Sequence, residues 1–317
     1  MITRLFPHIP QFLVAWGVFV ACGLIYYVIR QVRSGARFSL KSLYHQIIPF
    51  DVRSERSFHA DMKVYAIDSF TGVLFAAPGL LLTGAIGLAV YRRMSDLVAL
   101  PTASFPLVAA PACAMIMFVL AELSDWFFHY LEHKVPELWE LHKLHHAVEL
   151  LNPFTARRLH PVSLILNGLA RGLISGVPAG LLMFIFGITI AEILALSLVA
   201  SKIFSVTSLN PLKHSHHPIS FGPFDRLLIS PHMHQAHHSR LDAHIDKNFG
   251  TNLAVFDWLF GTAHQPQPGE LIEFGLSGYD STHLEEYFSL RGAYLQPLIN
   301  SAALFQRRMA SRRYSRS

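Results

Sequence analysis

Residues 162–208 read VSLILNGLARGLISGVPAGLLMFIFGITIAEILALSLVASKIFSVTS, and this stretch decides the fold class. A helix crosses a bilayer with about 20 apolar residues, so this stretch is too long for a single crossing. Gly187 and Thr189 interrupt it, and threonine is a residue type that caps the first turn of a helix. The sequence therefore predicts a tight hairpin of two membrane helices.

Three further apolar stretches precede this hairpin. They run from Gln11 to Ile29, from Val64 to about Val90, and from about Phe105 to Tyr130. Pro78 and Gly79 are expected to break the second of them. Together the stretches predict an all-α integral membrane protein, a bundle of about four to five membrane helices. The polar, histidine-rich chain after residue 209 predicts a cytosolic cap of short helices.

The composition supports a membrane protein. Hydrophobic residues make up 52% of the 317 residues and charged residues 15%, against about 25% charged in soluble domains. The net charge of +5 is concentrated in the linker 30–63 and the C-terminal tail, which fits cytoplasmic flanks better than a nucleic-acid-binding face. This distribution places all the histidine motifs on the cytoplasmic side. No signal-peptide cleavage pattern follows the first apolar stretch, so we expect a retained anchor.

These observations divide the chain into three parts. Residues 1–63 are expected to form a membrane anchor and a cytosolic linker. Residues 64–265 are expected to form the membrane core with the histidine site, and residues 266–317 a basic cytosolic tail. The two cysteines, Cys22 and Cys113, lie in apolar stretches without a metal-binding or disulfide pattern.

The histidines carry the strongest functional signal. Fourteen of the 19 fall between His129 and His244. HYLEH (129–133) places two rings at i and i+4, whereas HKLHH (142–146) and HQAHH (234–238) each place three rings at i, i+3 and i+4. On a helix such positions share a face, so each segment can direct its imidazoles toward one point. Neutral imidazole binds iron, zinc, copper or nickel, and the pattern predicts a metal site.

The spacing alone leaves several functions open. A membrane metal transporter or storage protein also carries cytosolic histidines, although transport sites lie near the bilayer midplane on broken helices. HYLEH also matches the HxxEH string of zinc hydrolases, with Glu132 as the base, but this interpretation leaves both HxxHH motifs unexplained.

The motifs together resemble the fatty acid hydroxylase/sterol desaturase superfamily of integral-membrane di-iron oxygenases. The resemblance covers about residues 120–265, in matching order and spacing. It rests on DWFFHYLEH (125–133), HKLHH (142–146), RRLHP (157–161), KHSHH (213–217), SPHMHQAHHS (230–239), DKNFG (246–250) and FDWLFGT (256–262).

The resemblance implies two irons that activate O₂ at a site built almost entirely of histidine. Carried over residue by residue, the implied metal ligands are His129, His133, His142, His145, His146, His160, His214, His234, His237 and His238. So cationic a site needs carboxylates or other acceptors around it. We expect Asp125, Asp246 and Asn248 to orient ligand rings, and His216, His217, His232 and His244 to lie near the site or in the polar cap. Glu192 is expected to be buried or to face a pore, and His8, His45, His59, His264 and His283 to lie at the surface.

The implied activity is O₂-dependent hydroxylation of a membrane lipid, such as a fatty acyl chain, a sterol or carotenoid ring, or an aminolipid. A lipid desaturase of the same superfamily is the closest alternative. The resemblance identifies no substrate-binding residue, although Trp126, Phe127, Phe128 and Trp139 can line an entrance or form an interfacial belt. No electron-carrier domain is evident in the sequence, so a separate reductase is expected. A bacterial inner membrane is favoured, or the endoplasmic reticulum if the source is eukaryotic.

Overall fold

The computed structural model describes residues 56–98, 109–278 and 284–314, together with residues 37–47 and scattered positions between 17 and 35. Most of the predicted span from Gln11 to Ile29 lies outside the described residues, as do His8, His283 and the side chain of His45. The described part is helical and contains no β-strand, only isolated bridges from Leu228 to Leu253 and from Ser239 to Phe274.

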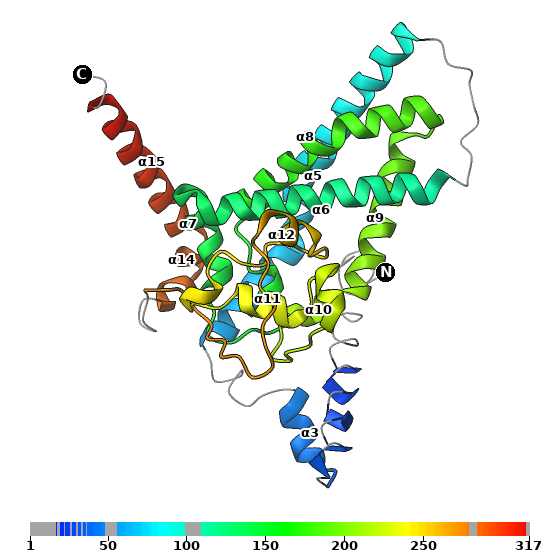
Figure 1. Ribbon diagram of the computed structural model, residues 1–317. Coiled ribbons are helices and arrows are strands. Elements are labelled where there is room, and N and C mark those ends of the chain that lie inside the picture. The colour runs from blue at the N-terminus through cyan, green and yellow to red at the C-terminus, as the bar shows by residue number, and fades with distance from the viewer. Residues whose placement is uncertain are drawn as a thin grey trace.

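Four of the described helices are long and apolar enough to cross a membrane, which confirms the all-α membrane fold. They are α5 (Arg56–Leu97), α6 (Ala110–Lys134), α8 (Pro161–Phe186) and α9 (Ile190–Thr207), and Figure 1 shows α8 running along α5. The shorter helices are α3 (Leu40–Ile47), α7 (Pro136–His146), η2 (Thr155–Arg157), α10 (Asn210–Lys213), η3 (Gly222–Arg226), α11 (Pro231–His237), η4 (Asp242–His244), α12 (Val255–Phe260), η5 (Glu285–Phe288), α14 (Leu290–Tyr294) and α15 (Gln296–Tyr314).

The predicted hairpin is present as α8 and α9. Gly187 ends α8 in the left-handed conformation (φ 65°), where a side chain would be strained. Thr189 caps α9 through a reciprocal capping box with Glu192. Glu192 is exposed at the helix start, so the expectation that it is buried is wrong.

Helix α5 continues through Pro78, so the predicted break in this stretch is wrong. Proline is tolerated inside membrane helices because neighbouring groups compensate for the lost backbone bond. The 42 residues of α5 extend about 63 Å, about twice the thickness of the hydrocarbon core. The first turns of α5 therefore reach beyond the membrane and contact the cap.

Helices α5 and α8 pack closely because glycines face each other. Gly168, Gly172, Gly176 and Gly180 recur every four residues on α8, and a Cβ added at any of the last three would come within 3.0 Å of α5. On α5, a Cβ at Gly79 would lie 2.3 Å from the carbonyl oxygen of Gly168. Small residues at this spacing allow two membrane helices to approach backbone to backbone.

We expect Gly79→Ala to destabilise the protein by about 1–3 kcal/mol, the usual cost of overpacking. Gly84→Ala on the same helix is the matched control, because a Cβ there meets nothing within 4 Å. Thermal unfolding in detergent should show a lower midpoint for the first variant only. Equal midpoints would mean that the glycine contact does not set the helix spacing.

The cap gathers at one end of the bundle, where α5 and α8 begin and α6 and α9 end (Figure 1). Arg158, just before α8, is fully buried and donates at 2.8 Å to Asp61 near the start of α5. Asp61 also accepts from Asn152 and Thr155, so the segment between α7 and α8 is fixed to α5. At the C-terminal end, α15 packs against α7, so the region predicted as a basic tail contains a helix attached to the cap.

Candidate metal centre

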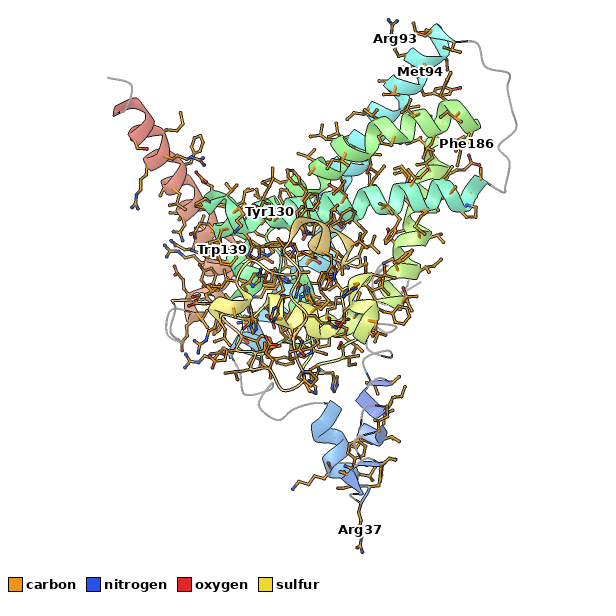
Figure 2. All side chains as sticks on the ribbon, viewed as in Figure 1. Arg37, Arg93, Met94, Tyr130, Trp139 and Phe186 are labelled. Carbon is orange, nitrogen blue, oxygen red and sulfur yellow. The ribbon has the colours of Figure 1, made fainter. Side chains whose placement is uncertain are left out.

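Nine of the ten histidines predicted as metal ligands converge in the cap, at the end of the bundle where Figure 2 labels Tyr130 and Trp139. They form two adjacent groups, in each of which one ring nitrogen per residue lies within 4.8 Å of all the others. The five-histidine cluster consists of His129, His133, His142, His146 and His237, and the four-histidine cluster of His145, His214, His234 and His238.

The two HxxHH motifs serve both clusters in a crossed pattern. On α7, the i and i+4 rings of His142 and His146 enter the five-histidine cluster, and the i+3 ring of His145 enters the other. At α11 the assignment is reversed, because the i+3 ring of His237 enters the five-histidine cluster. Rings at i and i+4 lie nearly above one another, whereas i+3 lies to one side, so one helix can face two centres.

The nitrogens of the four-histidine cluster are spaced as ligands of one ion would be. The Nε2 of His214 lies 3.1 Å from those of His234 and His238 and 3.3 Å from that of His145. Nitrogens held about 2.0–2.1 Å from one ion lie about 2.8–3.4 Å apart when they are neighbours in octahedral or tetrahedral geometry. Each neutral imidazole has a single N–H, so three nitrogens in mutual contact cannot all satisfy one another. These four residues therefore fit a metal ion.

The nitrogens of the five-histidine cluster also have the spacing expected of ligands of one ion. The Nε2 of His142 lies 3.1 Å from the Nε2 atoms of both His129 and His146. The Nε2 atoms of His133 and His237 are buried and have no hydrogen-bond partner. A bound cation would give all five lone pairs a partner.

The rings outside the membrane helices are held neutral, the form that binds metal. Burial lowers the pKa of His145, His146, His234, His237 and His238 well below the ordinary histidine value, and neighbouring rings lower it further. Burial also lowers the pKa of His214 to about 3. Protons therefore do not compete for these nitrogens near neutral pH.

The DKNFG segment orients three rings of the five-histidine cluster from outside. The Asp246 carboxylate lies 3.5 Å from Nδ1 of His133, and the carbonyl oxygens of Lys247 and Phe249 lie 2.7 Å and 2.8 Å from Nδ1 of His237 and His129. Two left-handed residues, Asp246 and Asn248 (φ 59° and 58°), shape the backbone of this loop. Such outer partners fix ring orientation and raise ligand basicity.

Glu132 is a fourth outer partner of this cluster. It is buried, its Oε2 lies 3.3 Å from Nδ1 of His142, and it also accepts a hydrogen bond from Ser163. The HxxEH string had predicted for Glu132 only the role of a hydrolase base. The sequence did contain a signal for this contact. Glu132 lies between two predicted ligands at the membrane boundary, where an unpaired charge is costly, so a partner for its carboxylate was to be expected.

Buried carboxylates hold the DKNFG loop over the rings. Asp257 accepts from Trp126 at 3.0 Å and from the backbone N–H groups of Phe249 and Gly250, both at 2.8 Å. Glu122, inside α6, accepts from both nitrogens of Asn252. The FDWLFGT motif and the acidic residues of α6 thus position the loop.

Several predicted site residues lie elsewhere. Asp125 does not contact a ligand ring, because it forms a two-point ion pair with Arg171 of α8. His160 lies outside both clusters: its Nδ1 accepts from Val162 at the start of α8, and its Nε2 lies 3.0 Å from the Tyr294 carbonyl. Asn248 donates to two backbone carbonyls and contacts no ring. His216, His217 and His232 also lie outside both clusters.

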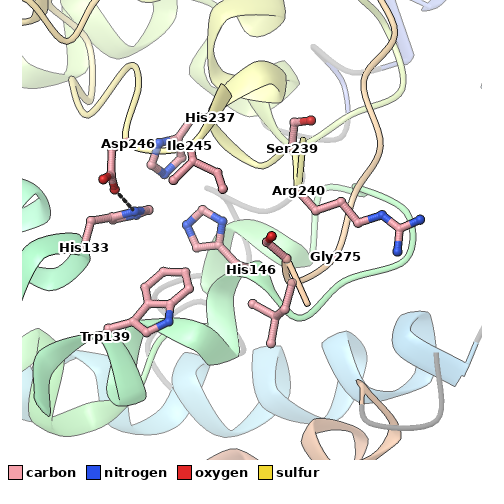
Figure 3. A pocket seen from close by; sticks show the side chains of 11 residues that line it. His133, Trp139, His146, His237, Ser239, Arg240, Ile245, Asp246 and Gly275 are labelled. Atoms are coloured by element: carbon pink, nitrogen blue, oxygen red, sulfur yellow. Dashed lines mark ion pairs between the residues drawn. The ribbon is translucent and has the colours of Figure 1, made fainter. Parts of the chain in front are cut away.

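A pocket of about 260 Å³ opens onto the five-histidine cluster alone (Figure 3). His133, His146 and His237 line it together with Trp139 and Arg240, and no ring of the four-histidine cluster does so. A second, mostly apolar pocket of about 490 Å³ lies at the membrane helices. Of the four aromatic residues predicted at an entrance, Trp126 and Phe127 line this pocket, Trp139 lines the first, and Phe128 lines neither.

Comparisons with known proteins agree on one family. The model of the fatty acid hydroxylase family matches residues 114–262, the segment that contains every residue of both clusters. An ornithine lipid hydroxylase of Rhizobium tropici is 29% identical over 50% of this chain. The alkylglycerol monooxygenases of Danio rerio and Homo sapiens are each 26% identical, over 51% and 50% of the chain.

These alignments cover 44% of the rhizobial enzyme and 32% of each alkylglycerol monooxygenase, so the similarity is confined to less than half of each relative. No solved structure is significantly similar to this chain.

Proposed function

Because this chain belongs to the fatty acid hydroxylase superfamily through residues 114–262, we propose that it is a di-iron hydroxylase of a membrane lipid. The observation that carries the proposal is the pair of adjacent histidine clusters, whose nitrogens are spaced for two ions. An oxidoreductase acting on lipid also agrees with the names of the similar proteins and with the four membrane-crossing helices.

When bound, two irons would provide the binding site for O₂ and pass electrons to it, which cleavage of an unactivated C–H bond requires. The net reaction consumes the C–H bond, one O₂, two electrons and two protons, and forms the C–OH group and one water. The electrons come from a separate reductase or electron carrier.

The chain's own residues provide position and environment. The ions would be held by the histidines of α6 and α7, those in and just after α11, and His214 after α10. Glu132, Asp246 and the loop carbonyls fix the rings. Trp139, Ile245 and Leu276 line the apolar side of the pocket and exclude water from the target carbon. We infer that the substrate meets the five-histidine cluster, because only its rings reach the pocket.

Among lipids, we favour an acyl lipid with a polar headgroup, such as an aminolipid. The pocket places Arg240 and Ser239 beside the apolar residues, which suits a polar group attached to a chain. The ornithine lipid hydroxylase has the highest identity of the three relatives described above. The cap is proposed to face the cytoplasm of a bacterial inner membrane, following the basic linker.

The other functions considered from the sequence fit less well. A hydrolase built on HYLEH would keep Glu132 free as a base, but Glu132 contacts His142 and accepts from Ser163. A metal transporter would place its ligands near the bilayer midplane, whereas these rings lie at one end of the bundle.

Lipid analysis tests the proposal directly. Membranes of cells that express the chain should contain a lipid about 16 Da heavier than its precursor, because one oxygen has been added. A desaturase would instead give a product about 2 Da lighter. An unchanged lipid profile, with the protein present in the membrane and loaded with iron, would contradict the assignment.

A further inference from the structure

A third group of metal-binding side chains lies outside both clusters, at the end of the cap. His244, His264 and Glu270 each offer a ligand atom, and these atoms lie within 4.8 Å of one another. We propose that they form a third metal site, a two-histidine, one-carboxylate site for a divalent transition-metal ion. Neither the family match nor the relatives assign a role to this group, and Glu270 and His264 lie beyond the matched segment.

The three ligands converge on a small volume. The Oε1 atom of Glu270 lies 2.7 Å from Nε2 of His244 and 2.7 Å from Nε2 of His264. The two imidazole rings are 5.0 Å apart. Ligands about 2.0–2.2 Å from a common ion are separated by similar distances, so an ion can enter with small ring movements.

The ligands are held in place before any ion binds. The second oxygen of Glu270 accepts from the backbone N–H of Gln267 at 2.6 Å, which fixes the carboxylate plane. The backbone of His264 is held on both sides by Asn248, whose Oδ1 accepts from its N–H and whose amide donates to its carbonyl, both at 2.7 Å. Such preorganisation reduces the ordering cost of binding.

The ligand chemistry indicates which ions fit. Two imidazoles and one carboxylate suit Zn²⁺ or Fe²⁺ and leave coordination positions for water. His244 is buried, whereas the side chains of His264 and Glu270 are 27% and 23% exposed. The site therefore has a closed side and a side through which an ion and its water ligands can enter.

The position of this site gives it a structural role. His244 lies two residues before Asp246, and His264 is bonded to Asn248, so the three ligands bracket the DKNFG loop. That loop supplies Asp246, Lys247 and Phe249 to the rings of the five-histidine cluster. An ion here would clamp the loop; this role, unlike the site itself, rests on the proposed function.

Without an ion, Glu270 can accept a hydrogen bond from each ring. The alternative to a metal site is therefore a hydrogen-bonded group of three side chains that binds no metal. Metal counting decides between them. The full chain, purified in detergent and stripped of metal, is equilibrated with Zn²⁺, desalted and analysed by mass spectrometry. We expect three zinc ions per chain in the unmodified protein and two in Glu270→Gln, whose amide keeps the shape but loses the charge.

Glu273→Gln is the matched control, because Glu273 pairs with Arg240 and lies outside the ligand group; it should keep three ions. His264→Asn is a second variant, at a partly exposed position, and should also bind two. Equal zinc content in Glu270→Gln, His264→Asn and the control would overturn the third site. That result leaves the lipid assay unaffected, so failure here is distinct from failure of the proposed hydroxylase.

Discussion

Replacing His145 by alanine is expected to abolish lipid hydroxylation while leaving the protein in the membrane. His145 is buried, and its Nε2 lies 3.3 Å from that of His214, so its loss removes one of the four nitrogens of the four-histidine cluster. Removing only an outer partner of a metal ligand costs about 10–100-fold in affinity or activity, and loss of the ligand itself should exceed about 100-fold.

The measurement is the hydroxylated lipid per unit of membrane protein, together with iron per chain. We expect the variant to hold about one iron per chain fewer than the unmodified protein, since the five-histidine cluster contains no contribution from His145. His59→Ala is the control, because His59 is exposed on α5 and should change neither quantity. Full activity in His145→Ala would remove the four-histidine cluster from the mechanism.

The fold was predictable where a signal is local. The hairpin follows from an apolar stretch too long for one crossing and from Thr189. The capping box of Thr189 involves only Glu192, in the first turn of the same helix, so it can be recognised in the sequence. The continuity of α5 was not predictable, because it depends on how the helix packs against α8 around Gly79. Helix rules derived in water overstate the effect of proline there.

In the site, too, the features set by local spacing were predictable and those set by packing in space were not. Rings at i, i+3 and i+4 are visible in sequence, but their division between two clusters depends on the approach of α7 and α11 in space. The outer partners Lys247 and Phe249 act through backbone carbonyls, which every residue carries, so no residue type identifies them. Asp125 was assigned to a ring by helical spacing, yet Arg171 of α8 lies nearer.

The two clusters differ in what surrounds them. Four rings of the five-histidine cluster have an oxygen next to their outer nitrogen, two of these oxygens belonging to carboxylates. In the four-histidine cluster, none of the Nδ1 atoms has a hydrogen-bond partner among the described residues. Lys213, adjacent to His214 and buried, brings an amine and no acceptor oxygen to that side; burial lowers its pKa to about 7. The five-histidine cluster should therefore hold its ion more tightly.

Glu132→Gln should consequently lower the affinity of the five-histidine cluster for its ion and leave that of the four-histidine cluster unchanged. The carboxylate lies 3.3 Å from Nδ1 of His142, so it stabilises that ring's N–H and the positive charge of an ion bound at Nε2. Gln keeps the shape and loses the charge. We expect the affinity of the five-histidine cluster for iron to fall about 10–100-fold, with that of the four-histidine cluster unchanged.

Iron release to a chelator resolves the two clusters as two phases when it is measured in a Glu270→Gln background, which removes the proposed third site. With Glu132 intact, one iron should leave readily and the other slowly; in Glu132→Gln, the slow phase should become faster and the fast phase should not change. Asp242→Asn, an exposed carboxylate in η4, is the control and should leave both phases intact. If both phases shift together, or if neither does, the carboxylate does not distinguish the two sites, and their unequal surroundings have no consequence for metal binding.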